Sequence, residues 1–148
     1  VQIAVDYYAK SGYNCSQAVA VTYADLLGLD PLMCFKGMET FGHGMGSKLG
    51  TCGAISGAIF LAGFVSSTGN MDDDKTNKSK KVSYDLAAKI TEEFYQINHT
   101  VTCSDLKDVK GGLFRSCLDC IADAARLVEK YVLPEYFTKW EKPANQKL

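Results

Sequence analysis

The stretch 51-TCGAISGAIFLAGF-64 decides the fold. After Thr51 its apolar residues fall on every side of a helix and not along one stripe. A helix that is apolar all round belongs in the centre of a bundle, away from water. Gly57 and Ala58 are small enough to let a neighbouring helix approach closely. The apolar positions are Ala54, Ile55, Ala58, Ile59, Leu61, Ala62 and Phe64.

Apolar residues recur at helical spacing on both sides of this segment. Capping residues and glycines mark where these helices begin and end. We predict an all-α fold, a single domain over residues 1–148, built as one bundle of five or six helices with a glycine-rich loop before the buried central helix. Three helices are predicted before the central one: a helix ended by Ser11-Gly12, a helix between Asn14 and Gly28, and a helix that Asp30-Pro31 opens and that runs through Met38. After the central helix we predict an amphipathic helix over 82–98, a turn at 103–106, a last helix over 115–132 and a polar tail over 134–148. The last helix is predicted to turn Ile121, Ala124, Ala125 and Val128 inward.

Composition and charge exclude several classes of protein. Of the 148 residues 47% are hydrophobic and 22% are charged, which is typical of a globular domain and not of disorder. A net charge of −1 gives no electrostatic basis for binding nucleic acid or an anionic membrane. The longest apolar run, 54–65, is about half the length that a membrane span requires, and residues 1–10 lack a secretory apolar core. We therefore expect a cytoplasmic protein with no nucleic-acid partner and no membrane span.

Several of the six cysteines lie where helices are predicted to begin. Cys15 follows the cap Asn14, Cys52 follows Thr51, and Cys117 and Cys120 lie in the first turns of the last helix. A helix N-terminus has free amide donors and a partial positive charge, which favour a thiolate over a thiol. The thiolate is both a nucleophile and a metal ligand, so these positions indicate redox or metal chemistry.

Free cysteine also acts as a small buried hydrophobe, and this is the interpretation we assign to Cys34. Its neighbours Met33, Phe35 and Met38 are apolar, and apolar surroundings raise the pKa of a thiol. Cys34 is therefore predicted to be structural.

Cys117 and Cys120 form a C-x-x-C motif, and two positions three apart share one face of a helix. The motif is compatible with a dithiol pair, with half of a zinc or iron–sulfur site, or with chance spacing. Haem attachment is disfavoured because Ile121 and not histidine follows. A thioredoxin fold is disfavoured because no strand–helix–strand pattern surrounds the motif.

The glycine-rich segment 41-FGHGMG-46 is expected to be a flexible or tightly turned loop. Its His43 is a candidate base or ligand, although a histidine in such a loop is more commonly only solvated. The acidic run 72–74 is more simply a solvated helix start than a metal site.

The sequence resembles a known family along nearly its whole length. The residues that carry the resemblance are the string 13-YNCSQA-18, the glycine-rich loop, the C-G-A-x-x-G string at 52–57, Phe94 with 103-CSDL-106, and the cysteine of the last helix. The family is C_GCAxxG_C_C, whose members are described as redox-active and some of which are selenoproteins. The resemblance implies that Cys15, Cys52, Cys103 and Cys117 are the family's four cysteines, with Cys120 an addition.

The leading hypothesis is a thiol-based redox protein in which Cys15, Cys52, Cys103 and Cys117 converge, with no cofactor required. Cys52 is the predicted reactive thiol, with a pKa at least about 1 unit below the ordinary value of about 8.5. The alternative is an iron–sulfur or zinc-binding module built from Cys15, Cys52, Cys103, Cys117 and Cys120. A third possibility is a helical partner-binding domain with incidental cysteines.

Overall fold

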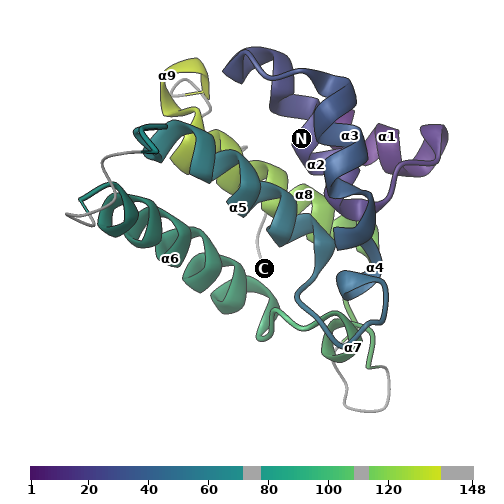
Figure 1. The fold of residues 1–148 in the computed structure, drawn as a ribbon. Helices are drawn as coiled ribbons and strands as arrows, with labels where there is room; N and C mark the ends of the chain where they lie inside the picture. The colour runs from purple at the N-terminus through teal and green to yellow at the C-terminus, as the bar shows by residue number, and fades with distance from the viewer. Residues whose placement is uncertain (72–77, 109–113, 138–148) are drawn as a thin grey trace.

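The computed structural model describes residues 1–71, 78–108 and 114–137 (Figure 1). Helices dominate these ranges, which contain one isolated backbone bridge and no longer strand. Six of the helices have eight residues or more, so the predicted all-α bundle is confirmed. In chain order the elements are α1 (Gln2–Ser11), α2 (Cys15–Ala24), η1 (Asp25–Leu27), α3 (Pro31–Met38), η2 (Glu39–Phe41), α4 (Gly42–Met45), α5 (Gly53–Ser66), α6 (Lys78–Asn98), α7 (Cys103–Leu106), α8 (Cys117–Leu127), η4 (Val128–Val132) and α9 (Pro134–Phe137).

The central helix is α5, which packs against α2, α6 and α8 (Figure 1). It comes close to α2 at Gly57, where an added Cβ would lie 2.8 Å from the carbonyl oxygen of Ser16. The predicted close contact at Gly57 is therefore confirmed. The prediction that α5 is buried all round fails at its C-terminal end, where Phe64 is 51% exposed and Val65 is 44% exposed.

Local capping chemistry sets most helix ends where the sequence predicts them. The α1 helix ends at Gly12 and the α2–η1 segment ends at Gly28, both in the left-handed conformation that glycine adopts readily. Asp30 caps α3 by accepting a hydrogen bond from the Leu32 N–H at 2.9 Å, and Pro31 takes the first helical position. These three boundaries match the predicted ones.

The C-terminal part confirms one prediction and corrects another. Helix α8 continues into the wider turn η4, and the four residues predicted to face inward are fully buried. The expected polar tail from residue 134 is wrong at its start, because 134–137 form α9 and the Phe137 ring lies 6.3 Å from that of Tyr23. The preceding helical segment ends at Val132, as predicted, and Pro134 takes the first position of α9, where proline is favoured.

The acidic run 72–74 lies outside the described residues. Within the described part of the chain, no helix is both long enough and apolar enough to cross a membrane.

Candidate functional site

Five of the six cysteines converge where the N-termini of α2, α5, α7 and α8 meet, near the end of the bundle that carries α4 and α7 (Figure 1). Their thiols lie close enough to influence one another's charge, and we call them the cysteine cluster. All six cysteines of the chain are among the described residues and are free thiols. The members of the cysteine cluster are Cys15, Cys52, Cys103, Cys117 and Cys120.

A capping box holds Cys15 as the first residue of α2. The Asn14 side chain accepts hydrogen bonds from the Ser16 and Gln17 N–H groups at 3.1 and 3.0 Å, and the Gln17 side chain accepts one from the Asn14 N–H at 3.0 Å. The Cys15 sulfur packs against the start of α5, where a Cβ on Gly53 would lie 2.5 Å from it. The second residue of the C-G-A-x-x-G string therefore makes room for the first cysteine.

A backbone bridge orients Cys52 and Cys103 together. Thr51 and Thr102 pair in antiparallel fashion, and the Cys52 N–H donates to the Val101 carbonyl oxygen at 2.7 Å. The Cys103 N–H donates to the Gly50 carbonyl oxygen at 3.0 Å, so both cysteines are held next to the bridge, and the neighbouring Cys52 acts on the pKa of Cys103. Cys52 itself is the N-cap residue of α5, and Thr51 lies in the bridge.

The first turn of α8 carries the remaining two thiols. Ser116 and Asp119 form a capping box in which the Ser116 hydroxyl accepts from the Asp119 N–H at 3.0 Å. Cys117 is half-buried and hydrogen-bonds with Tyr8 of α1, whereas Cys120 is fully buried and hydrogen-bonds with Cys52. Tyr8 thus touches the outer thiol of the pair, and Cys52 touches the inner one.

The pKa values of Cys52 and Cys120 are shifted in opposite directions. Hydrogen bonding to Cys120, followed by burial, raises the pKa of Cys52, and the amides of Ala54 and Ile55 only partly oppose this. Hydrogen bonding from Cys52 lowers the pKa of Cys120 despite its burial, and the charge of Lys107 adds to that effect. The predicted low pKa at Cys52 is therefore wrong, because the helix N-terminus that favours its thiolate is outweighed by burial and by a second sulfur.

The two flanking thiols stay protonated more strongly than an ordinary cysteine. Burial is the largest cause of the raised pKa of Cys15, and the backbone N–H of His43 opposes it. Burial also raises the pKa of Cys103, and the neighbouring Cys52 adds to the effect. Cys120 is thus the cluster member whose pKa is held below its usual range.

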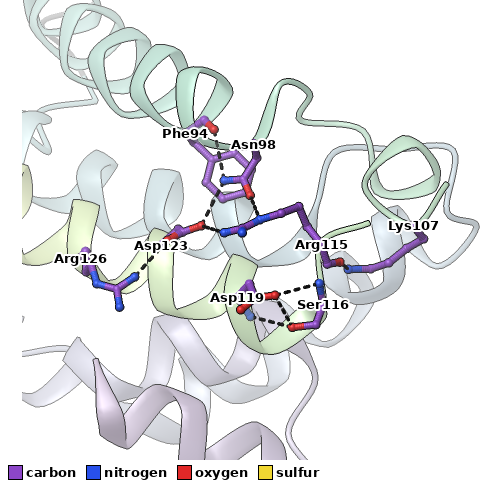
Figure 2. A network of polar contacts seen from close by, with 8 residues as sticks. All are labelled: Phe94, Asn98, Lys107, Arg115, Ser116, Asp119, Asp123 and Arg126. Atoms are coloured by element: carbon purple, nitrogen blue, oxygen red, sulfur yellow. Dashed lines mark hydrogen bonds and ion pairs between the residues drawn. The ribbon is translucent and has the colours of Figure 1, made fainter. Parts of the chain in front are cut away.

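A buried polar network ties the start of α8 to α6 (Figure 2). Arg115 donates to the Asn98 side-chain oxygen at 2.7 Å and to the Asp123 carboxylate at 2.6 Å. Arg126 donates to the other oxygen of Asp123 at 3.0 Å, and Lys107 of the α7 segment donates to the Arg115 carbonyl oxygen. The network fixes the segment that carries Cys117 and Cys120 relative to the rest of the bundle.

The glycine-rich segment is a tight turn that includes α4, and not an open loop. His43, Met45 and Lys48 all have positive φ, a conformation that non-glycine residues adopt at a cost. Gly44 lies against Cys103, where a Cβ would come within 2.4 Å of the cysteine's own Cβ. The His43 side chain is exposed, so it contributes its backbone N–H to the site and not its imidazole.

The structure brings together the four cysteines singled out by the resemblance and adds Cys120, which the thiol hypothesis had left out. The i, i+3 spacing from Cys117 was the available signal, since it places both sulfurs on one helix face. Cys34 lies apart, in an apolar pocket with Ala20, Ala24 and Met38, and burial raises the pKa of its thiol. In the parts of the chain that the structure describes, no group of three or more His, Cys, Asp and Glu side chains is arranged to hold a metal ion.

Comparison with known proteins agrees with the sequence resemblance. The model of the family described as "Putative redox-active protein (C_GCAxxG_C_C)" matches residues 13–131, a range that contains all five members of the cysteine cluster. No solved structure matches the chain. On the extent of the family match, this chain belongs to the C_GCAxxG_C_C family.

Proposed function

We propose that the protein exchanges electron pairs with its partners through thiol–disulfide chemistry in the cysteine cluster. The observation that carries the proposal is the pairing of Cys52 with Cys120 in its centre. Cys52 keeps its proton and donates a hydrogen bond, and Cys120 has a pKa below its usual range, so the pair offers one thiolate that can attack a disulfide and a second thiol that can complete the exchange.

The overall reaction moves two electrons. The reduced pair reacts with an outside disulfide, R–S–S–R′, to give a Cys52–Cys120 disulfide plus RSH and R′SH. The outside disulfide is reduced, the two cysteines are oxidised, and their two protons leave on the released thiols. The reverse direction oxidises an outside dithiol with the same balance.

The flanking cysteines supply further partners for the same pair. Cys103 follows Thr102 in the backbone bridge, and both Cys52 and Cys15 influence its pKa. Their raised pKa values leave a small thiolate fraction near neutral pH, which slows their attack on a disulfide. We assign them to a slower, second exchange that opens the Cys52–Cys120 disulfide from the Cys52 side.

The alternative, in which the same cysteines hold zinc or an iron–sulfur cluster, has no specific observation in its favour. Such a site needs ligands converging tetrahedrally on one point, and the described residues present no group of three so arranged. Elemental analysis of the purified protein nevertheless belongs in the test, because it reports on this alternative directly.

The test is disulfide mapping of protein purified anaerobically and reduced. Titration with one equivalent of a small disulfide should consume two thiols, and peptide mapping should find Cys52 linked to Cys120. Cys120→Ala should abolish this link. Cys34→Ala, the matched control, removes a buried thiol outside the cysteine cluster and should leave the link and the reactivity of the other five thiols intact. Oxidation that spares Cys52 and Cys120, or stoichiometric zinc or iron in the protein, would overturn the proposal.

A further inference from the structure

Access to solvent separates one member of the cysteine cluster from the other four. Cys15, Cys52 and Cys103 are 6%, 4% and 6% exposed and Cys120 is fully buried, whereas Cys117 is half-buried. Attack on a disulfide requires the thiolate to meet the substrate sulfur directly. A sulfur enclosed by protein cannot do this with an outside molecule, so the buried pair needs an intermediary.

Cys117 lies where an intermediary is required. It precedes Cys120 by three residues on α8, so the two sulfurs share a face of the first turn. Cys120 in turn hydrogen-bonds with Cys52. The three sulfurs therefore form a sequence from the surface to the interior, with each able to reach the next.

We infer that Cys117 is the exchange thiol through which an outside disulfide reacts with the cysteine cluster, and that Tyr8 is its positioning residue. The inference rests on the proposed function and names the first step of that chemistry. The substrate class is a disulfide whose sulfur atoms are exposed, since Cys117 is reached from the surface.

The steps balance at each sulfur. The Cys117 thiolate attacks R–S–S–R′, which forms a Cys117–S–S–R mixed disulfide and releases R′S⁻. The Cys120 thiolate then attacks the Cys117 sulfur and releases RS⁻. Finally Cys52 passes its proton to the released RS⁻ and its sulfur attacks the Cys120 sulfur, which regenerates the Cys117 thiolate and leaves a Cys52–Cys120 disulfide. Two electrons have passed to the substrate.

Tyr8 is placed to orient the exchange thiol. It lies on α1, which packs against α8, and it hydrogen-bonds with Cys117. That hydrogen bond, with burial second, raises the pKa of Tyr8 to about 12, so the phenol keeps its proton near neutral pH. A phenol O–H that donates to sulfur stabilises the thiolate and fixes its direction.

The experiment uses the reduced full chain and the disulfide 5,5′-dithiobis(2-nitrobenzoate), whose released thiolate is coloured. The protein of native sequence is treated with less than one equivalent of the probe and quenched with acid. Peptide mapping by mass spectrometry should then find the first adduct on Cys117. Cys120→Ala should trap that adduct and abolish the fast second release. Cys117→Ala should slow the first release by about 10-fold or more, because the remaining cluster thiols are buried. Cys34→Ala should not change it.

Tyr8→Phe keeps the ring and removes the hydroxyl, so it should slow the first release at a fixed pH without changing the second step. An unchanged rate of first release, or an equal slowing of both steps, would overturn the role of Tyr8. A first adduct on another cysteine, or an unchanged rate in Cys117→Ala, would overturn the role of Cys117. If Cys117 is labelled first but no second release follows and no internal disulfide forms, the proposed function fails while the access step stands.

Discussion

Gly53→Ala tests whether the second residue of the C-G-A-x-x-G string is there to make room for a cysteine sulfur. The new Cβ would lie 2.5 Å from the Cys15 sulfur, about 0.9 Å inside the 3.4 Å at which ordinary contacts begin. It would also lie 2.9 Å from the carbonyl oxygen of Phe41 and 3.1 Å from the Gly42 Cα, and backbone atoms yield less than side chains. Overpacking of this kind costs about 1–3 kcal/mol, more than alanine contributes at the first position of a helix.

The matched control is Gly63→Ala in the same helix, where a Cβ meets nothing within 4 Å. There the substitution should raise the free energy of unfolding by up to about 1 kcal/mol through helix propensity alone. Urea unfolding followed by circular dichroism measures both variants. We expect Gly53→Ala to be less stable than the unmodified protein and to have altered Cys15 alkylation, and Gly63→Ala to be equally or more stable. Equal stabilisation by the two substitutions would refute the assigned role of Gly53.

Two further predictions concern charged groups. Arg115→Ala removes the 2.6 Å partner of the nearly buried Asp123 carboxylate and should lower the free energy of unfolding by about 2–4 kcal/mol. The control is Arg126→Ala, at a side chain that is 47% exposed, which should lower that free energy by less than about 1 kcal/mol in the same urea assay. Equal losses in the two variants would contradict the assigned role of Arg115. Burial alone would raise the pKa of Glu93, but its hydrogen bonds, the larger from Lys130, hold that pKa below the ordinary 4.5. The stability that the lowered pKa contributes is present above the pKa of Glu93 in the unfolded chain and is lost as the pH falls through its pKa in the folded protein. Between about pH 5 and pH 3, Tm should therefore fall less steeply in Glu93→Gln than in the protein of native sequence. Parallel curves would count against the pairing of Glu93 with Lys130.

Helix boundaries were predictable because they depend on neighbours in the sequence. Asn14 caps α2 and Asp30 with Pro31 starts α3 through contacts within two or three residues. The inward face of α8 was predictable for the same reason, since the spacing of its apolar residues sets it. The short helix α9 was missed because a proline is compatible both with the end of one helix and with the first position of the next, and the contact of Phe137 with the core is not set by its neighbours in the sequence.

The candidate site was predictable in its members and not in its electrostatics. Helix starts and the family resemblance pointed to Cys15, Cys52, Cys103 and Cys117, which the structure brings together. The lowered pKa was assigned to Cys52 from its helix position alone. Which sulfur faces which is set by the crossing of α5 and α8, and that crossing reverses the assignment in favour of Cys120.

Unequal pKa values also give the cysteine cluster a way to avoid scrambling its own disulfides. Five neighbouring thiols permit ten different pairings, and thiol–disulfide exchange interconverts them at rates that depend on the thiolate fraction of each attacking sulfur. Burial holds the pKa of Cys15 and Cys103 above its ordinary value, so their attack is slow. The nearby charge of Lys107 and the hydrogen bond from Cys52 keep Cys120 the readier nucleophile. Cys120 is therefore the thiol that first attacks a mixed disulfide at Cys117, and the thiols with raised pKa values act only after it, which directs the exchange along one sequence of cysteines.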